Sequence, residues 1–500
     1  MALVPYRIMK KEKYLTAPVP SEKMPAGIPY ILTNEAAERF AFYGSRCILV
    51  FFMTHLLKSA SGALAPMTAE QSKTWFHLFV SAVYFTPLLG ALISDIWLGK
   101  YRTILWFSVL YCFGFFALAL DHTRLGLAVG LILIAVGSGV IKPCVSANVG
   151  DQFGETNKHL ISRVYQWFYF AINLGAFISN LLVPELLERY GPTVAFGVPG
   201  VFMVLATIAF WLGREKFVHI PRGGLEFVKE CFSGQEKFTH IPRAALVFLE
   251  RCFSGQEKFL HIPRTALGFL KKCFVGEGIS AIGKLSIIYL FVAPFWALFD
   301  QMDSSWMLQA EKMNRDWLGY TWLPTQIVAL NPLMILILIP AFSYVIYPAI
   351  NKVFPLTSLR KIGLGLLVAG SPFVVSALIE TKITAGGAPS IGWMVLGYAL
   401  LTSAEIMVSI TCLEFSYTQA PKRMKSFIMA VFLLSISLGN AFTAIVNAVI
   451  ENEDGTSKLA GAHYYWFFVG VMFVTALLFI PIAKRYPVKN YIQDEAPVPD

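Results

Sequence analysis

Twelve long apolar runs limit what this sequence can fold into more than any other feature. Each run is close to the roughly 20 residues that an α-helix needs to cross about 30 Å of hydrocarbon. Their approximate spans are 28–56, 75–98, 103–120, 125–149, 161–184, 192–212, 282–303, 325–348, 362–380, 391–418, 424–449 and 464–484. Hydrophobic residues make up 56% of the 500 residues and charged residues only 14%, which excludes an ordinary soluble protein. The sequence therefore predicts an all-α integral membrane protein with twelve transmembrane helices.

The distribution of basic residues predicts how these helices cross the membrane. The first 27 residues are polar and basic and lack the apolar core of a cleavable signal peptide. When the N-terminus is placed in the cytoplasm, most Lys and Arg residues outside the spans fall on the cytoplasmic side. We therefore expect a multi-pass protein of the cell inner (plasma) membrane with both termini cytoplasmic. The net charge of +10 then reflects orientation and attraction to anionic lipids, and nothing suggests nucleic-acid binding.

The order of the apolar runs predicts two bundles of six helices. We expect a cytoplasmic tail (1–27), an N-terminal bundle (28–212), a cytoplasmic linker (213–280), a C-terminal bundle (281–484) and a second cytoplasmic tail (485–500). In membrane carriers, two such bundles enclose a substrate site near the middle of the bilayer. This organisation favours a transport protein.

The linker contains three copies of a 21-residue repeat, which begin REKFVHIPR, QEKFTHIPR and QEKFLHIPR. In each copy a proline (Pro221, Pro242 or Pro263) precedes about ten residues of amphipathic pattern, too few to span a bilayer. The simpler interpretation is a string of short helices on the cytoplasmic face, and the alternative is a partner-docking or regulatory module. Each copy has one His and one Cys, which does not match a zinc pattern, and we expect neither a metal nor a cofactor.

Charged residues inside the first apolar run require an explanation, because a charge near the bilayer centre costs about 2.5–3.5 kcal/mol. Glu35, Glu38, Arg39, Phe42 and Arg46 recur at helical spacing and form one stripe of a helix. The two carboxylates and two guanidiniums can neutralise one another. A network that only holds helices together is one interpretation, and a functional site is the other.

Further ionisable residues in other runs favour the functional interpretation. Lys142 lies in the middle of its run next to Pro143, and Asp300 and Glu405 lie in two runs of the second half. A buried carboxylate can take up a proton, while a neighbouring cation favours its charged form. Competition between a proton and a cation for the same carboxylate would act as a proton switch.

The charges in the two halves also suggest what is carried. Arg46 and Lys142 in the first half are cations, whereas Glu405 in the second half is an anion, so a zwitterion could bind to both. Uncharged hydrogen-bonding side chains lie at similar depth: Tyr43, Tyr84, Asn173 and Asn331. A substrate with a carboxylate and an ammonium group fits this set.

Other classes of function receive less support from the sequence. The chain has no HExxH pair, no GxSxG motif and no P-loop, so we do not expect an enzyme. A carrier of another solute, such as nitrate or a peptide-like drug, remains an alternative, although Glu405 has little use in an anion carrier. A receptor or scaffold that uses the repeat linker is a further alternative.

Several motifs resemble those of the proton-coupled oligopeptide transporter family of the major facilitator superfamily. Residues 35–43 follow the family's ExxERFxYY signature, with Phe42 in place of the first tyrosine, and residues 168–175 (FYFAINLG) follow its FYxxINxG signature. Residues 90–102 (GALISDIWLGKYR), which include Asp95, are similar to a loop motif of the superfamily. His77 resembles the second-helix histidine of the animal peptide carriers.

The resemblance implies uptake of di- and tripeptides driven by proton entry through alternating access. It implies that Arg46 and Lys142 bind the peptide carboxylate and that Glu405 binds its amino group. Further substrate contacts are implied for Tyr43, Tyr84, Asn173, Trp296 and Asn331, proton coupling for Glu35, Glu38, Arg39, Asp300 and His77, and gating for Asp95. Asp300 would pair with Arg46, and Glu35 and Glu38 with Lys142. The partners would be the peptide, protons and the lipid bilayer. We expect a monomer of the plain twelve-helix, bacterial kind.

Overall fold

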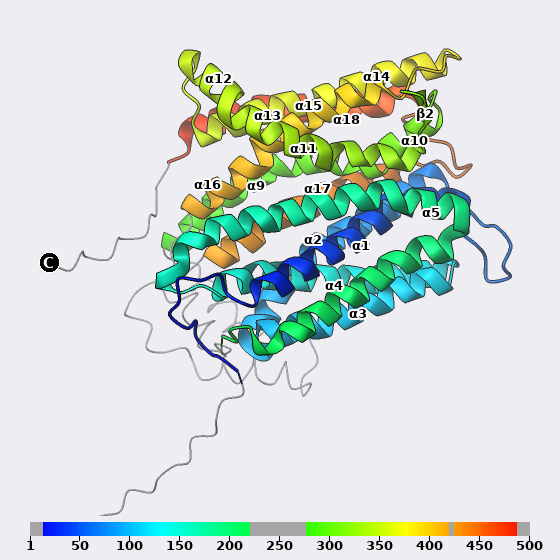
Figure 1. Cartoon of the computed structure of the whole chain (residues 1–500). Helices are drawn as coiled ribbons and strands as arrows, with labels where there is room; N and C mark the ends of the chain where they lie inside the picture. Colours follow the sequence, from blue (N-terminus) through cyan, green and yellow to red (C-terminus); the bar gives the residue numbers. More distant parts are fainter. Residues whose placement is uncertain (1–13, 221–276, 420–424, 488–500) are drawn as a thin grey trace, which may run out of the picture. The chain divides into compact units, whose positions relative to one another are not determined.

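The computed structural model describes residues 14–220, 277–419 and 425–487, and almost all of these residues are helical (Figure 1). The amphipathic segments expected between Pro221 and Gly276 lie outside the described residues. The described chain forms two compact units. Of the described residues, 14–72, 89–220 and 322–333 belong to unit 1, and 73–88, 277–321, 334–419 and 425–487 belong to unit 2. The predicted domain boundaries at 212 and 281 stay a prediction.

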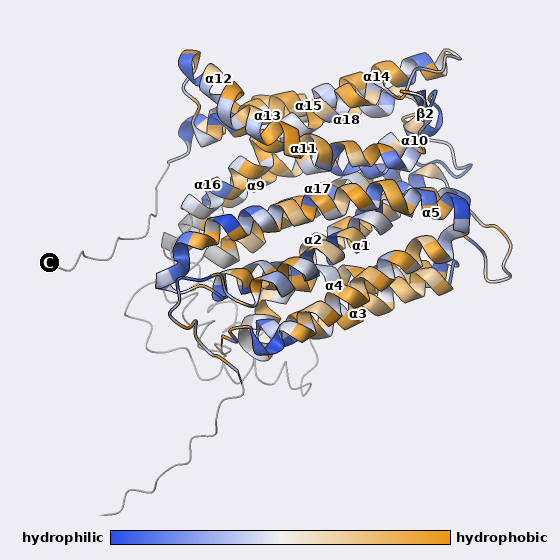
Figure 2. Ribbon diagram, in the orientation of Figure 1, coloured by the Kyte–Doolittle hydropathy of each residue, from blue (hydrophilic) through white to orange (hydrophobic). Residues whose placement is uncertain are grey.

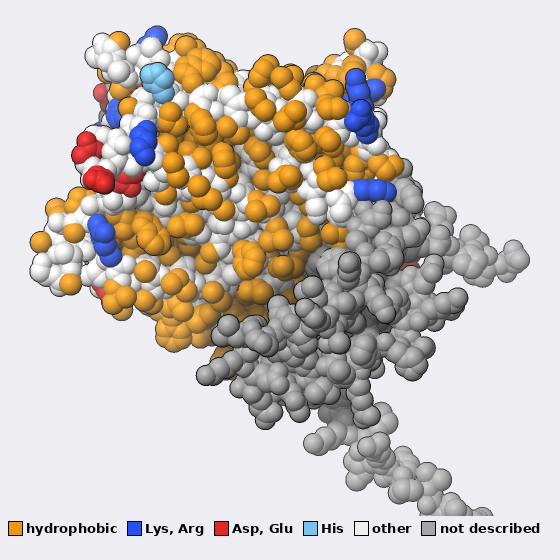
Figure 3. All heavy atoms as spheres, turned by 180° about the vertical axis from the view of Figure 1, so that it is seen from behind, with side chains coloured by type: hydrophobic (Ala, Val, Ile, Leu, Met, Phe, Trp, Pro, Cys, Tyr) orange, Lys and Arg blue, Asp and Glu red, His pale blue; other side chains and the backbone are white. Residues whose placement is uncertain are grey.

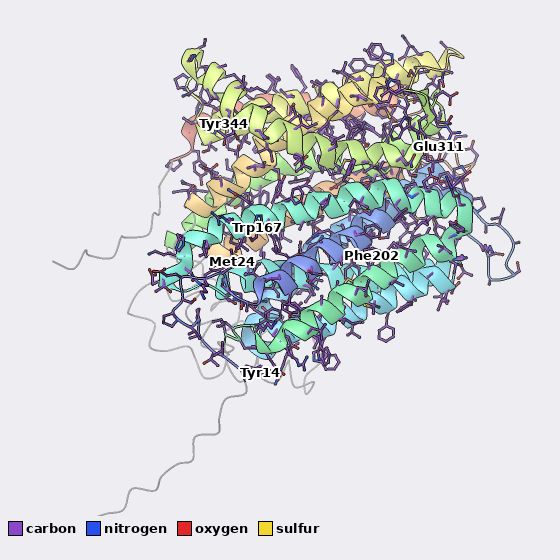
Figure 4. The ribbon with its side chains drawn as sticks, in the orientation of Figure 1. Tyr14, Met24, Trp167, Phe202, Glu311 and Tyr344 are labelled. Atoms are coloured by element: carbon purple, nitrogen blue, oxygen red, sulfur yellow. The ribbon has the colours of Figure 1, made fainter. Side chains whose placement is uncertain are left out.

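Unit 1 is built on four long helices, which are α1 (Ile28–His55), α3 (Lys100–Leu120), α4 (Arg124–Asp151) and α5 (Ile161–Leu212). Within α5, Gly191 has φ +76°, a left-handed conformation that glycine adopts without a steric penalty, and Pro192 follows it. The chain turns back at this point, and α1 packs against both arms of α5 (Figure 1). Phe40 of α1 stacks on Phe202 of the second arm with ring centroids 4.0 Å apart (Phe202 is labelled in Figure 4). The predicted separate runs 161–184 and 192–212 correspond to these two arms.

Shorter elements complete unit 1. They are the π-helix η1 (Ile93–Leu98) and the 3₁₀ helices η2 (Glu155–Leu160), η3 (Gly213–Glu215) and η5 (Pro324–Ala329). Within the unit, α3 packs on α4 and α5, and η5 packs on α1 and α5. Gln326 of η5 donates through Nε2 to the Leu181 carbonyl of α5 at 3.1 Å, which ties a segment of the second half of the sequence to unit 1.

Helix α2 (Ala69–Leu92) begins in unit 1, and its residues 73–88 belong to unit 2. The other elements of unit 2 are α9 (Glu277–Phe299), η4 (Asp300–Asp303), α10 (Ser305–Glu311), β1 (Asp316–Trp317), β2 (Tyr320–Thr321), α11 (Leu330–Ala341, from residue 334), η6 (Phe342–Ile346), α12 (Tyr347–Val353), α13 (Ser358–Ala369), α14 (Ser371–Thr384), α15 (Trp393–Glu405), η7 (Ile406–Ile410), α16 (Thr411–Gln419), α17 (Lys425–Ile450) and α18 (Ala462–Arg485). Helix α17 packs on α9, and α13, α14, α15 and α18 pack together.

Helices α17 and α9 approach closely because position 439 of α17 is a glycine, which has no side chain. A Cβ added at Gly439 of α17 would lie 2.3 Å from the Ala293 carbonyl oxygen and 2.8 Å from the Ala297 nitrogen of α9. Small residues let helix backbones approach closely inside membranes, where dispersion contacts hold helices together. This contact sets the position of the neighbouring Asn440 relative to α9.

The helices confirm the predicted membrane protein. Ten helices of the described residues are long and apolar enough to cross a bilayer, and α5 is counted once among them although it folds back at Gly191. Helix α1 is not counted among the ten, and its 28 residues include the charged side chains Glu35, Glu38, Arg39 and Arg46. When α1 and the second arm of α5 are added, the twelve predicted spans are accounted for.

The distribution of side chains fits a lipid environment. Hydrophobic residues run along the long helices, and hydrophilic residues gather toward helix ends and connections (Figure 2). In the space-filling view, hydrophobic side chains cover much of the face, while Lys, Arg, Asp and Glu lie toward its edges (Figure 3). Helix α3 alone exposes Trp106, Phe113 and Leu120 by 60% or more. Large apolar side chains of this kind are expected to contact lipid tails.

Candidate functional site

A buried charge cluster in unit 1 occupies the polar stripe of α1. Arg39 Nε lies 2.6 Å from Glu35 Oε1 and 3.1 Å from Glu38 Oε2. Both carboxylate side chains are 2% exposed and the guanidinium side chain 12%. Glu35 and Arg39 lie one helical turn apart, with the acidic residue on the N-terminal side, which is the favourable order for such a pair. Ion pairs therefore join these three residues of the stripe, and neutralisation of the whole stripe, which includes Arg46, stays a prediction.

Lys142 of α4 reaches the same stripe. Its ammonium group lies 4.2 Å from the ring centroid of Phe42, one turn after Glu38 and Arg39. A cation over an aromatic face gains about 0.5–2 kcal/mol, depending on how far it is desolvated. Phe42 is the residue that replaces a signature tyrosine, and its ring supports the Lys142 ammonium without a hydroxyl group. Unit 1 therefore brings two carboxylates and two cations together, and the buried guanidinium of Arg46 lies on the same helix.

A second polar chain lies within unit 2 and connects three helices. His77 of α2 is fully buried, with Nδ1 2.7 Å from Asn440 Oδ1 of α17 and Nε2 3.0 Å from Ser304 Oγ. Asn440 donates through Nδ2 to Asp300 Oδ2 of η4 at 2.6 Å and to the Ile436 carbonyl at 3.0 Å. One amide side chain thus links a buried imidazole to a buried carboxylate.

The hydrogen bonds of this chain determine which atom carries each proton. A backbone carbonyl only accepts hydrogen bonds, so the Asn440 group that contacts both Ile436 and Asp300 is its NH₂ group, and its oxygen faces His77. The imidazole Nδ1 then carries the proton, and Nε2 accepts from the Ser304 hydroxyl. A second proton at Nε2 would force Ser304 to accept and to turn its own hydrogen, and the Gln301 carbonyl lies 3.5 Å away. Binding of a proton to His77 Nε2 would therefore change the direction of its hydrogen bond with Ser304.

Other residues predicted for the site take the following positions. Arg46 is 3% exposed in α1, and Asn173 of α5 is 8% exposed and donates to the Tyr169 carbonyl at 2.9 Å. Asn331, at the start of α11, belongs to unit 1 and is also buried. Tyr43 is half-buried on α1.

Unit 2 contains three further predicted residues. Trp296 is buried on α9 and makes edge contacts with Phe295 and Phe299. Tyr84 and Glu405 are half-buried, and Glu405 ends α15 directly before the π-helix η7. Such π-helical turns often lie at functional sites. Asp95 falls in η1 of unit 1, and its side chain is outside the part that the structure describes.

The structure groups the predicted residues into two sets. Glu35, Glu38, Arg39 and Lys142 meet in unit 1, and His77 and Asp300 meet in unit 2 through Asn440. The implied pairs of Asp300 with Arg46, and of Glu35 and Glu38 with Lys142, stay predictions.

Asn440 and Ser304 were missed at the level of the sequence. A signal was present, since polar residues recur in the last-but-one apolar run at helical spacing, at Ser437, Asn440, Thr443 and Asn447. Among the described residues, no group of three or more His, Cys, Asp and Glu side chains is arranged to hold a metal ion.

These features define a polytopic helical membrane protein of the major facilitator superfamily fold, with buried ionisable clusters in its helices. The chain belongs to the POT family, whose family model matches residues 101–467. Solute carrier family 15 member 2 of Rattus norvegicus is 35% identical over 376 residues, which are 72% of this chain and 49% of that protein. Peptide transporter family 1 of Drosophila melanogaster is 35% identical over 391 residues, which are 75% of this chain and 50% of that protein. The chain spans about half the length of these curated relatives.

A solved structure covers more of the chain. The in meso crystal structure of the POT family transporter PepTSo is similar with a TM-score of 0.78 and 36% sequence identity, covering 93% of this chain and 99% of that chain. This similarity over nearly the whole length of both chains confirms the predicted fold class and the predicted family.

Proposed function

We propose that the protein is a proton-coupled symporter that imports di- and tripeptides by alternating access and is not an enzyme. The observation that carries this proposal is the buried chain His77–Asn440–Asp300, in which two groups able to bind a proton are linked by one amide. Ionisable residues inside a membrane are costly and usually mark a path for ions or substrate. Family membership supports the same conclusion, because the Drosophila relative is named as a peptide transporter and the similar solved structure as a POT family transporter.

We assign roles to the predicted residues on the same basis. Arg46 and Lys142 bind the peptide carboxylate, Glu405 binds its ammonium group, and Asn173 and Asn331 bind its backbone. Tyr43, Tyr84 and Trp296 contact the substrate, Glu35, Glu38 and Arg39 take part in proton coupling, and Asp95 acts as a gating residue. A guanidinium matches the two oxygens of a carboxylate, which favours this use of Arg46. We place the protein in the cell inner membrane as a monomer. Both termini are assigned to the cytoplasm, because this orientation places most Lys and Arg residues outside the spans on the cytoplasmic side.

Proteoliposomes test the proposal directly. Labelled dipeptide should accumulate when the interior is negative and the exterior acidic, since each charge moved across 100 mV supplies about 2.3 kcal/mol. A protonophore should abolish the accumulation, and uptake that is unaffected by it would refute the coupling. Glu405→Gln should reduce uptake of dipeptides with a free amino group, and unchanged uptake would refute the role of Glu405.

A further inference from the structure

The first copy of the linker repeat begins inside the described chain, where it contacts unit 1 closely. Its segment Gly213–Ile220 follows α5 directly. The surrounding residues, which we call the docking site, are Tyr14, Leu15, Gly27, Tyr30, Tyr101, Gln152 and Phe210. They come from the N-terminal segment, α1, α3, the end of α4 and α5, and Tyr14 is labelled in Figure 4. The proposed transport function does not use this site.

Phe217 is the anchor of the docked segment. It is fully buried, and its ring lies 4.9 Å from the Phe210 ring. A Cβ added at Gly213 would lie 2.4 Å from this ring, and one added at Gly27 would lie 2.7 Å from it. The Phe217 ring therefore fits the site only because the residue four positions before it, Gly213, has no side chain.

Two more side chains of the segment are recognised. Lys216 donates through Nζ to the Tyr30 hydroxyl at 2.7 Å. The ring of His219 stacks on Tyr14 with centroids 4.3 Å apart, and its Nε2 lies 2.7 Å from the Arg214 carbonyl oxygen. The recognised pattern is thus a glycine, then a lysine and a phenylalanine, and then a histidine.

The remaining hydrogen bonds to the docking site use the backbone of the segment, while the Val218 side chain is also buried and the Arg214 side chain contacts Trp211 and Glu215. Val218 donates its N–H to Gln152 Oε1 at 3.0 Å and forms a parallel bridge with Leu15, and His219 N–H donates to the Leu15 carbonyl at 2.7 Å. Backbone contacts do not depend on the side chain at position 218. The bond from His219 to residue 214 also requires only a carbonyl.

Over residues 213–222 and 234–243, the first two repeat copies share every residue that the site recognises and differ at only two positions. The second copy, residues 234–243, reads GQEKFTHIPR, and the first reads GREKFVHIPR. The glycine, lysine, phenylalanine and histidine are identical, and the two differences fall at positions 214 and 218, where the structure uses backbone atoms. The second copy can supply each contact described above.

We propose that the docking site binds the pattern G-x-x-K-F-x-H and that the second copy, Gly234–His240, exchanges with the first copy in it. The first copy is favoured because it follows α5 without a loop, whereas the second must close a loop of 21 residues. When the second copy is docked, 21 more residues lie between α5 and the docking site. The linker between the docking site and α9 is then 21 residues shorter. The repeat would then regulate the length of the connection between the site and α9.

Disulfide trapping tests the proposal in the full-length protein with its native cysteines replaced by serine. Leu15 and Val218 are bridge partners, so their Cα atoms lie within the range that a disulfide can span. Leu15→Cys with Val218→Cys should therefore cross-link on mild oxidation. Leu15→Cys with Thr239→Cys should cross-link weakly, and the yield should rise roughly fivefold or more when Phe217→Ala removes the anchor of the first copy.

Controls separate exchange from chance collision. Leu15→Cys with Leu246→Cys, in the middle of a repeat, gives the background yield. Adding Phe238→Ala to Phe217→Ala should return the Thr239→Cys yield to that background. If Phe217→Ala does not fold, Lys216→Ala replaces it, because this side chain is exposed and its loss opens no cavity. The proposal is overturned if the Thr239→Cys yield equals the background in a folded variant whose first copy is weakened.

Discussion

The charge balance of the unit 1 cluster predicts a large loss of stability when Arg39 is replaced by methionine. Arg39→Met removes the cation that is paired with both Glu35 and Glu38, and it leaves these two buried carboxylates without their closest counter-charge. Removing one partner of a buried ion pair costs about 3–5 kcal/mol. At about 2–4 °C per kcal/mol, the thermal midpoint should fall by roughly 6–20 °C. The double variant Glu35→Gln, Arg39→Met also removes one of the two carboxylates that lost its partner, and it should recover more than half of the loss.

Thermal unfolding in detergent measures both variants, and the chain offers a matched control. Arg189 and Glu185 form a pair of the same spacing at 3.0 Å, but the arginine side chain is 69% exposed, so Arg189→Met should cost no more than about 1 kcal/mol. Two results would refute the reasoning: an Arg39→Met midpoint within the range of the Arg189→Met control, or a double variant less stable than Arg39→Met alone.

Three further predictions follow from local geometry. Gly439→Ala should destabilise the protein by about 1–3 kcal/mol, measured by thermal unfolding, because its Cβ would overlap the Ala293 carbonyl, and an unchanged midpoint would contradict this packing. Phe42→Leu should weaken uptake while Phe42→Tyr preserves it, since only an aromatic ring supports the Lys142 ammonium; equal uptake by both would remove that role. Burial lowers the pKa of His219 below its usual value, so undocking binds protons. Because thiol oxidation itself slows at low pH, the yield of the Leu15→Cys/Val218→Cys cross-link is compared with that of the same pair carrying His219→Gln. The ratio should fall as pH falls through about 6.5, and a constant ratio would argue against this role of His219.

Much of the helical layout can be predicted from the sequence, because a helix that crosses the lipid bilayer needs an apolar run of a defined minimum length. The length of each apolar run is set by the thickness of the bilayer, and the interval between the predicted runs 161–184 and 192–212 contains Gly191, where α5 turns back. The stripe on α1 is likewise visible, since helical periodicity places Glu35, Glu38 and Arg39 on one face before any tertiary contact is known.

Contacts between distant segments could not be predicted in the same way. His77 and Asn440 are 363 positions apart, and no spacing rule connects them. Their contact depends on which helices become neighbours and on the close approach that Gly439 permits between α17 and α9. The resemblance named His77 and Asp300, but the amide that links them became visible only in three dimensions. The docking of the first repeat copy also depends on residues from several separate elements.

The central claim is that protonation of the His77–Asn440–Asp300 chain drives peptide uptake, and Asp300→Asn tests it most directly. Reconstituted Asp300→Asn should lose accumulation of labelled dipeptide driven by an acidic exterior, because the carboxylate end of the chain can no longer change charge. It should retain exchange of external for internal dipeptide when no proton gradient is applied, since exchange needs no net proton movement. Accumulation at the wild-type level by Asp300→Asn under the same pH gradient would contradict the account.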